Sequence, residues 1–295
     1  MALMPFDDRD GSIWINGEII PWREATSHTL SHGLHYASTV FEGERVYSGV
    51  IFKGREHTER LRRSCEMLDF VLPLSDDEVD TAKMAVVEAN GIVDGYVRAF
   101  AWRGSEMMAI SAQHTTTHVA IAAWEWPSYF DPETKMKGIT LDIADWKRPS
   151  PESAPVHAKA AGLYMICTLS KHAAEKKGFQ DALMLDYRGY LAEATGANVF
   201  FVDKEGTIHT PIADCFLDGI TRRTVIALAE SLQMKVVQRH LTLDDLSEMT
   251  ECFLTGTAAE VTPVSQIGDA SFTPGDISRQ LVDGYENLVR GRIAL

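Results

Sequence analysis

Residues 182–210 read ALMLDYRGYLAEATGANVFFVDKEGTIHT, and this stretch decides the fold of the second half of the chain. Apolar residues dominate it, and two short polar segments interrupt it, Arg188-Gly189 and Lys204-Glu205-Gly206. A glycine within a polar segment between apolar runs is the usual signal of a turn between strands. The pattern therefore predicts a strand meander.

Helices flank this meander and do not alternate with its strands. One helix is predicted from about Gly162 to Lys177, where Gly178 ends it, and two more over Thr221 to Met234 and Asp276 to Arg292. A strand is expected over Ile139 to Ala144. Helices that follow groups of strands are typical of α+β folds. We therefore predict the α+β class and not a doubly wound sheet.

The first 123 residues predict a mixed unit of antiparallel strands and two helices. The Asn16-Gly17 turn between Ser12 and Pro21 is typical of a hairpin. One helix is expected over about Arg55 to Phe70, and Ser75-Asp-Asp-Glu78 is a capping-box sequence that opens a second, which Asn90-Gly91 ends. The remaining strands are expected over Ser38 to Tyr47, Val50 to Lys53, Tyr96 to Trp102 and Thr117 to Ala123.

Length and composition narrow the classes of function. A chain of 295 residues is long enough for about two domains. Residues 124–138, rich in Trp, Pro, Tyr and charge, predict an interdomain loop between domains at 1–123 and 139–295. The net charge of −14 argues against nucleic acid or an anionic membrane surface as a partner. No apolar run approaches about 18 residues and the first ten residues lack a secretory pattern, so we expect a cytoplasmic protein.

Cysteine and histidine give no metal-binding pattern. The four cysteines are widely spaced without a CxxC pair, and we expect buried reduced thiols and no metal site. The ten histidines show no ligand spacing. His28, His32 and His35 are expected to be loop and packing residues.

A lysine within small, mostly apolar residues is the first candidate catalytic group. Lys159 lies in Ala158-Lys-Ala-Ala-Gly-Leu-Tyr164, and removal of an ammonium group from water lowers its pKa and frees the amine for Schiff-base chemistry. Downstream, Glu193 would be able to stabilise the protonated ring nitrogen of pyridoxal phosphate. Each residue on its own is more typical of a solvated surface position.

Two short segments are candidates for binding a phosphate. Asp218-Gly-Ile-Thr221 precedes a helical run, so the amides of Ile220 and Thr221 would lie at the positive end of a helix. Gly256-Thr-Ala258 predicts a second nest of backbone amides. Arg60, one turn into its helix, would add a positive charge. Singly, these features are more typical of a simple turn or a solvated helix face.

Alternation along two strands suggests a site for a substrate. Tyr96 and Arg98 share one face of a strand, where Arg98 would bind a carboxylate through two hydrogen bonds. Phe41, Gly43 and Arg45 share a face in the same way. Phe41 would supply an apolar wall, and Gly43 would leave space for a branched side chain. Without other support, an ordinary half-buried strand with an exposed arginine is favoured.

Seven motifs occur in one order between about Ser12 and Val264. They are His35-Tyr36 with Val40-Phe-Glu-Gly43, Arg55-Glu-His-Thr-Glu-Arg-Leu61, Tyr96-Val-Arg98, Ala158-Lys159, Glu193-Ala-Thr-Gly-Ala-Asn198, Gly219-Ile-Thr221 and Thr255-Gly-Thr-Ala-Ala-Glu260. The set resembles the branched-chain aminotransferases, which are class IV aminotransferases of the fold-type IV pyridoxal phosphate enzymes. The resemblance implies a small α/β N-terminal domain and a larger C-terminal, cofactor-binding domain with a barrel-like sheet.

The resemblance also implies a role for each motif. Lys159 would hold the cofactor covalently and move the proton between substrate Cα and cofactor C4′, and Glu193 would pair with the pyridine nitrogen. Tyr36 would come from the neighbouring subunit, which implies a homodimer or higher homo-oligomer. The other cofactor-binding residues would be Arg60, Tyr164, Leu217, Ile220, Thr221, Gly256 and Thr257. Substrate would contact Tyr36, Phe41, Gly43, Tyr96, Arg98, Trp126, Tyr129, Thr257 and Ala258.

The reaction implied is the transfer of the amino group of L-leucine, L-isoleucine or L-valine to 2-oxoglutarate. An arginine at the edge of an apolar pocket suits both an aliphatic side chain and a γ-carboxylate. The alternatives are a relative that acts on D-amino acids or (R)-amines, an aminodeoxychorismate lyase, and a non-catalytic scaffold. Two departures from the family pattern, Leu163 and Asp218, bear on substrate preference and leave the catalytic groups in place.

Overall fold

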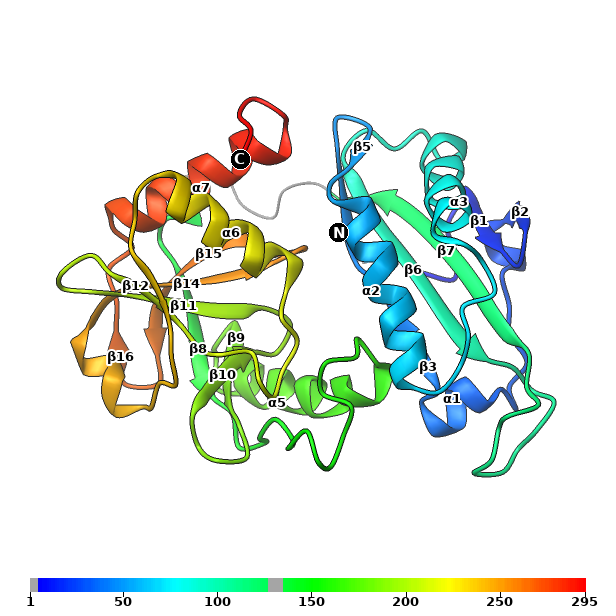
Figure 1. Cartoon of the computed structure of the whole chain (residues 1–295), viewed down its shortest axis with the longest axis horizontal. Helices are drawn as coiled ribbons and strands as arrows, with labels where there is room; N and C mark the ends of the chain where they lie inside the picture. The colour runs from blue at the N-terminus through cyan, green and yellow to red at the C-terminus, as the bar shows by residue number, and fades with distance from the viewer. Residues whose placement is uncertain (1–4, 127–134) are drawn as a thin grey trace. The chain divides into compact units, whose positions relative to one another are not determined.

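The structure is a computed structural model that describes residues 5–126 and 135–295. Its contacts divide the chain into two compact units (Figure 1). The first contains residues up to Pro127 together with Ala158–Gly162, and the second contains Ser128–His157 and Leu163–Leu295. The domain boundaries expected from the sequence assign residues 158–162 to the second domain. The structure groups them with the first, because Ala160 forms a β-bridge with Val40.

An antiparallel sheet organises the first unit. Its strand order is β2-β1-β7-β6-β4-β5, and β3 pairs with the same edge of β6 as β4 does. Asn16 and Gly17 both have positive φ, 50° and 106°, so the β1–β2 hairpin has the primed turn that the Asn-Gly pair predicts. The strands are β1 (Ser12–Ile15), β2 (Glu18–Pro21), β3 (Thr39–Phe41), β4 (Glu44–Tyr47), β5 (Val50–Ile51), β6 (Gly95–Arg103) and β7 (Thr117–Glu125).

The expected single strand from Ser38 to Tyr47 is divided in the structure. Strand β3 ends at Phe41 and β4 begins at Glu44, although the register against β6 is the same on both sides of the break. The interruption falls at residues 42 and 43, where the fully buried Glu42 carboxylate binds Arg60 and His57 of the neighbouring helix. The Glu42 amide still donates to the Ala99 carbonyl, so the strand that the sequence predicts as continuous is broken only locally.

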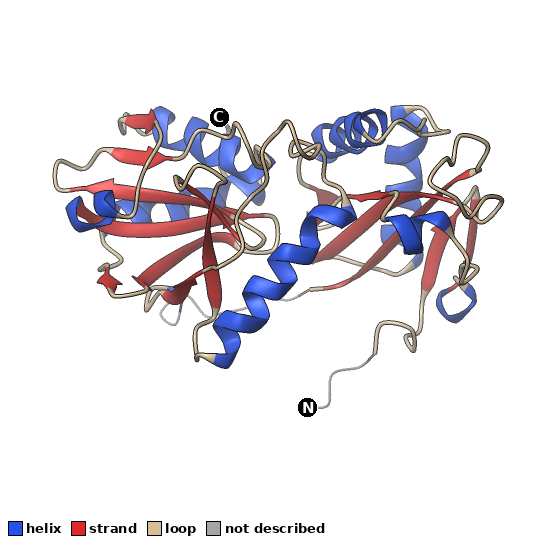
Figure 2. Ribbon diagram, turned by 90° about the horizontal axis from the view of Figure 1, so that it is seen from below, coloured by secondary structure: helices blue, strands red, loops and turns tan. Residues whose placement is uncertain are grey.

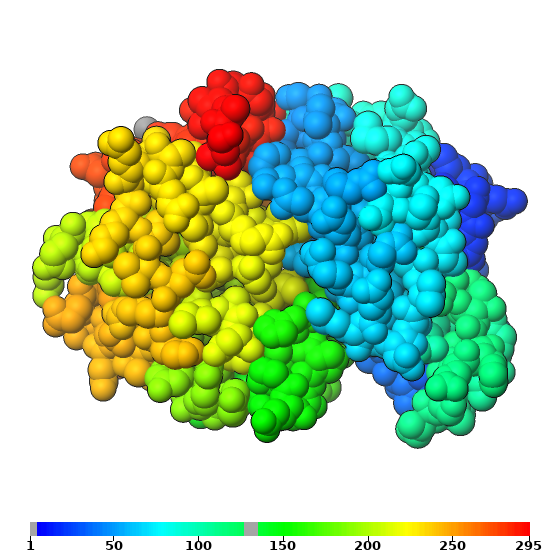
Figure 3. All heavy atoms as spheres, in the orientation of Figure 1, coloured from blue at the N-terminus to red at the C-terminus, as the bar shows by residue number. Residues whose placement is uncertain are grey.

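Two helices, α2 (Gly54–Met67) and α3 (Asp76–Ala89), pack beside this sheet (Figures 1 and 2). In the space-filling view, light blue to cyan atoms, around residues 50–90, form much of the face of the first unit that is turned toward the viewer (Figure 3). The short α1 (His32–Tyr36) and the 3₁₀ turn η1 (Trp22–Glu24) complete the helical segments described in this unit.

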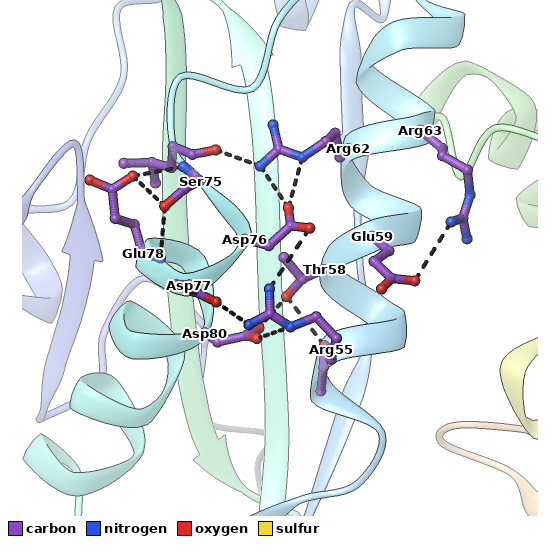
Figure 4. A network of polar contacts seen from close by, with 12 residues as sticks. Arg55, Thr58, Glu59, Arg62, Arg63, Ser75, Asp76, Asp77, Glu78 and Asp80 are labelled. Atoms are coloured by element: carbon purple, nitrogen blue, oxygen red, sulfur yellow. Dashed lines mark hydrogen bonds and ion pairs between the residues drawn. The ribbon is translucent and has the colours of Figure 1, made fainter.

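Charged side chains join α2 to α3. Arg55 is paired with Asp77 and Asp80, and Arg62 donates to the Asp76 carboxylate at 2.7 Å (Figure 4). The predicted capping box is confirmed at the start of α3. The Ser75 amide donates to Glu78 Oε2 at 2.7 Å, and the Glu78 amide donates to Ser75 Oγ at 3.3 Å. These local bonds fix α3 against the helix that carries Arg60.

The second unit contains a closed barrel. Six strands pair in the order β10-β9-β8-β15-β14-β11, and the pair Glu193↔Asn198 joins β11 back to β10. The predicted meander is confirmed from β9 to β12, and Leu183, Phe201 and Leu254 pack in the apolar core. The strands are β8 (Ile139–Ile143), β9 (Asp181–Leu185), β10 (Leu191–Ala194), β11 (Asn198–Asp203), β12 (Ile208–Thr210), β13 (Val236–Gln238), β14 (Met249–Gly256), β15 (Glu260–Ile267) and β16 (Ala270–Ser271).

Three helices of the second unit agree with the sequence prediction to within a few residues. They are α5 (Met165–Lys176), which follows the 3₁₀ turn η2 (Ala161–Tyr164), α6 (Ile220–Ser231) and α7 (Asp276–Val289). The 3₁₀ segment η3 (Asp244–Glu248) was not predicted. Strands and helices form separate groups in both units, and the α+β class is confirmed. All four cysteines lie within the described residues, buried and without a disulfide, as expected. In the same ranges, no helix has the length and apolar character needed to cross a bilayer.

Candidate active site

Lys159 lies in a short segment bound to the first unit through its backbone. The Lys159 amide donates to Ser64 Oγ on α2, and the Phe41 amide donates to the Lys159 carbonyl, both at 3.0 Å. The flanking Ala158 and Ala160 are almost fully buried, at 2% and 4% exposure. Small side chains on both sides let the segment approach β3 closely, so the lysine backbone is fixed from two directions.

The Lys159 side chain is in the environment that the sequence predicts for a reactive amine. Burial lowers the pKa of Lys159 from 10.5 to about 8, helped by the positive charge of Arg60 and opposed by Glu42 and Tyr96. Its Nζ lies 4.9 Å from the centroid of the Phe41 ring. Because the pKa is about 8, a useful fraction of the amine is neutral near physiological pH.

Arg60 is held by a carboxylate that the sequence analysis did not select. Glu42 is fully buried and accepts hydrogen bonds from Arg60 Nε at 2.7 Å, from Arg60 Nη2 at 2.8 Å and from His57 Nδ1 at 2.6 Å. Burial alone would raise the pKa of Glu42, but the charges of Arg60 and His57 hold it well below its usual value. The strand pattern could have indicated this residue, because side chains alternate between the two faces of a strand. Glu42 therefore points to the face opposite to Phe41 and Gly43.

The predicted substrate face is formed by β6 together with the β3–β4 edge. The Arg98 guanidinium lies 4.6 Å from the centroid of the Phe41 ring and 5.5 Å from that of Tyr96, so these three side chains share a face as expected. Gly43 is needed for a close approach. A Cβ at Gly43 would lie 1.9 Å from the Tyr96 hydroxyl oxygen, so the glycine makes room for Tyr96.

Aromatic residues extend this face. Trp126 lies 5.5 Å from Tyr96 between ring centroids, while Tyr129 falls outside the described residues. Tyr36 is 43% exposed on α1 and stacks on His32 at 4.6 Å. His32 makes hydrogen bonds with Ser38 Oγ and the Ala109 carbonyl, which confirms its expected packing role.

The second unit holds the other predicted cofactor residues, and Glu193 is at their centre. Glu193 lies on β10 at 9% exposure, with Oε2 3.3 Å from Asn198 Nδ2 and Oε1 3.3 Å from Arg148 Nε. Arg148 also donates to the carbonyl of Leu163, the residue before Tyr164. No sequence signal marks Arg148, because it lies in a loop without a recognisable motif. Arg148 places a positive charge beside this buried carboxylate.

The predicted phosphate-binding turn is built around Asn198. Asn198 Nδ2 donates to the Leu217 carbonyl at 3.0 Å, just before α6 begins at Ile220. A Cβ on Gly219 would come within 2.2 Å of Asn198 Oδ1, so a glycine is needed there. Ile220 and Thr221 form the buried first turn of α6, where the initial amides have no acceptor within the helix. Their position suits an anion.

The second predicted nest is the turn between β14 and β15. Gly256 pairs with Glu260, so residues 257–259 form a three-residue hairpin loop. Glu260 has a φ of 54° and closes this loop in the left-handed conformation. Its carboxylate accepts from Lys135 Nζ at 3.1 Å. The loop presents Thr257 and Ala258 on a rigid hairpin beside Gly256, where an added Cβ would lie 3.3 Å from the Gly196 carbonyl oxygen.

The structure thus assigns the candidate residues to two groups. The first unit carries Lys159 with its lowered pKa, Arg60 and the predicted substrate face. The second carries the fixed carboxylate of Glu193 and two turns with backbone amides. A lysine with a lowered pKa, a buried carboxylate and two turns with backbone amides are the features expected of enzymes that act through a lysine-bound cofactor.

Comparison with known proteins names the family. Residues 39–267 match the family described as amino-transferase class IV, and the chain belongs to it. It is 42% identical to a probable branched-chain-amino-acid aminotransferase of Rickettsia conorii, over 98% of this chain and 100% of that protein. It is 38% identical to the branched-chain-amino-acid aminotransferase of Pseudomonas aeruginosa, over 98% of this chain and 96% of that protein. The resemblance drawn from the seven motifs is confirmed.

Solved structures agree with this assignment. The T.th. branched-chain amino acid aminotransferase with pyridoxamine 5'-phosphate is 37% identical and has a TM-score of 0.93, over 97% of this chain and 96% of that one. The same T.th. enzyme complexed with N-(5'-phosphopyridoxyl)-L-glutamate gives a TM-score of 0.92 at 36% identity, over 97% and 96%. The fold is therefore that of a class IV aminotransferase across nearly the whole chain.

Proposed function

We propose that this protein is a pyridoxal phosphate-dependent transaminase that moves the amino group of L-leucine, L-isoleucine or L-valine to 2-oxoglutarate. The observation that carries the proposal is Lys159, whose amine has a lowered pKa and whose backbone is fixed next to the Arg98 and Tyr96 face. The relatives described above, which are named for this reaction, support it.

The chain's own residues fit the cofactor. Glu193, anchored by Arg148 and Asn198, would pair with the pyridine nitrogen, and Tyr164 with the phenolate oxygen. Leu217 would pack on the ring. When bound, pyridoxal phosphate supplies an electron sink for charge that develops at the substrate Cα. The phosphate would be held by Arg60 and by backbone at Ile220, Thr221, Gly256 and Thr257.

Lys159 then has two functions. Its amine would bind the cofactor, and once released it would accept the proton from the substrate Cα and return it in the second half of the reaction. Burial, helped by the charge of Arg60, lowers the pKa of Lys159 and keeps its amine partly neutral, as acceptance of that proton requires. Glu42 counteracts part of this effect.

Arg98 would distinguish the two kinds of substrate. Its guanidinium lies between the Phe41 and Tyr96 rings and is half-buried. A γ-carboxylate would form two hydrogen bonds with it. An aliphatic side chain would pack on the aromatic rings and leave the guanidinium partly solvated. The substrate α-carboxylate would be bound by Tyr96 and by the amides of Thr257 and Ala258, with Trp126 and Tyr129 in the side-chain pocket.

The assembly proposed is a homodimer or higher homo-oligomer in the cytoplasm. Tyr36 is 43% exposed and its neighbour Leu34 is 72% exposed, on a helix of only five residues. Large side chains exposed together on a short helix favour contact with a second copy. Tyr36 would thereby contribute to the partner's side-chain pocket.

The test is an assay of purified protein supplied with pyridoxal phosphate. We expect L-glutamate to form from 2-oxoglutarate only when a branched-chain donor is present, and the visible absorption of the bound cofactor to fall on addition of L-leucine alone. Lys159→Ala should abolish turnover. Absence of leucine-dependent glutamate would refute the proposal. Activity with D-alanine, 1-phenylethylamine or aminodeoxychorismate instead would support the corresponding alternative, and turnover by Lys159→Ala would favour a non-catalytic role for the lysine.

A further inference from the structure

The turn before α6 is fastened by a group of charged side chains that the proposed reaction does not use. Asp218 Oδ1 accepts from Arg222 Nη1 at 2.9 Å, and Asp218 Oδ2 lies 3.4 Å from Arg223 Nη1. Arg223 Nη1 also donates to the Asp218 carbonyl at 3.1 Å. One aspartate is therefore bound through both its side chain and its backbone to the first turn of the helix that follows it.

This group is connected to the rest of the second unit. Arg222 is 2% exposed, and its Nη2 donates to the Pro211 carbonyl at 2.9 Å and to Gln238 Oε1 at 2.8 Å. On the other side, the Leu217 carbonyl is held by Asn198. Two consecutive residues of this turn are therefore restrained, Leu217 through its carbonyl and Asp218 through ion pairs.

We propose that Asp218, bound by Arg222 and Arg223, is a positioning residue that fixes the turn before α6 so that its amides bind the cofactor phosphate. The inference rests on the proposed function. Amides bind an anion well only if they converge before it arrives, because ordering a flexible turn on binding costs affinity. The ion pairs of Asp218 with Arg222 and Arg223, called the clamp below, hold the turn in one conformation before the phosphate binds.

Charge alone predicts the opposite effect of Asp218. A carboxylate near the start of α6 repels an approaching phosphate, so removal of its charge should tighten anion binding if Coulomb forces dominate. If the clamp dominates, the same change should weaken binding. Arg223 is the comparison residue. Loss of its positive charge should weaken anion binding whether Coulomb forces or the positioning of the turn dominates. Asp218→Asn therefore separates the two explanations by the sign of its effect.

The experiment measures binding by the cofactor-free protein in a calorimeter. Pyridoxamine phosphate is the probe because it forms no bond with Lys159, and inorganic phosphate reports on the anion site alone. We expect Asp218→Asn, which loses the pairs with Arg222 and Arg223, and Arg223→Gln, which loses one pair, each to weaken binding of both probes by about fivefold or more, the scale of partly exposed ion pairs. Glu286→Gln, which breaks the i,i+4 pair between Glu286 on α7 and Arg290 just after it, is the matched control and should change neither dissociation constant.

The outcomes are distinct. Unchanged or tighter binding by Asp218→Asn overturns the clamp, whatever the activity of the protein. Failure of the unmodified protein to bind either pyridoxal phosphate or pyridoxamine phosphate overturns the proposed function instead. A thermal denaturation curve for each variant shows that it is folded, and the exposure of Asp218, 41% for its side chain, makes unfolding by the Asn substitution unexpected.

Discussion

Asn198 and Glu193 are the residue pair that closes the barrel of the second unit. They are backbone partners across β10 and β11, and their side chains also meet, with Asn198 Nδ2 3.3 Å from Glu193 Oε2. Asn198 Nδ2 also donates to the Leu217 carbonyl. The carboxylate proposed for the pyridine nitrogen and the turn proposed for the phosphate are therefore tied to one amide group.

Replacement of Asn198 by alanine should consequently affect both parts of the cofactor site. The Leu217 carbonyl loses its donor and Glu193 loses the amide that binds its Oε2, which should lower the free energy of unfolding by about 1–3 kcal/mol. We also expect weaker binding of pyridoxamine phosphate. Urea denaturation and calorimetry measure the two effects. Asn287→Ala on α7 is the control, and equal effects of the two substitutions would contradict the role given to Asn198.

Local sequence signals predicted most elements of this fold. The Asn16-Gly17 turn and the Ser75 capping box were correct because the residues that specify them are adjacent in the chain. Closure of the barrel was not predicted from local patterns. It needs β8 to pair in parallel with both β9 and β15, strands separated from it by long stretches of chain. The hydrophobic periodicity of a segment predicts that it forms a strand, but it does not indicate which distant strand it pairs with.

The site divides in the same way. Lys159 was recognisable because small residues surround it, and its lowered pKa agrees with that prediction. Glu42 and Arg148 were missed because their importance depends on partners from other elements, Arg60 and Glu193. The contact of Gly43 with Tyr96 was also not predicted, because Tyr96 comes from a different strand. Sequence indicates which residues are unusual, but the tertiary contacts decide what each one touches.

Glu42→Gln should lower the pKa of Lys159 further. Arg60 would keep its charge, while the negative charge that raises the pKa of Lys159 would be lost. The rate at which Lys159 reacts with a small aldehyde should therefore reach its maximum at a lower pH than in the unmodified protein. Glu56→Gln, which removes the carboxylate paired with Lys53 at the start of α2, should leave the profile unchanged. A shift to higher pH in Glu42→Gln would contradict this account.

Lys83 and Glu44 form a buried ion pair that supports the first unit. Lys83 Nζ donates to Glu44 Oε2 at 2.8 Å, and the two side chains are 1% and 0% exposed. Lys83→Met leaves the carboxylate without its partner and should cost about 3–5 kcal/mol of stability. The double variant Lys83→Met/Glu44→Leu should recover most of that loss. Urea denaturation tests both, and no recovery in the double variant would show that the cost arises from packing alone.

The pH dependence of stability offers a separate test of the Lys159 environment. In the folded protein without cofactor the pKa of Lys159 is about 8, against 10.5 for the exposed side chain. Between these values the unfolded chain binds the proton and the folded chain does not, so this residue makes stability rise with pH across that window. Below about pH 8 both states carry the charge, and the folded state must hold it away from water.

Lys159→Met should therefore be more stable than the unmodified protein at pH 7, and the difference should shrink between pH 8 and 10.5. Thermal denaturation across this range, without cofactor, measures the difference directly. Lys137→Met, at an exposed lysine, is the control, and its difference from the unmodified protein should be small at every pH. A constant difference for Lys159→Met from pH 7 to 10.5 would mean that the folded structure does not disfavour the charged amine, and the proposed activation of Lys159 by burial would be wrong.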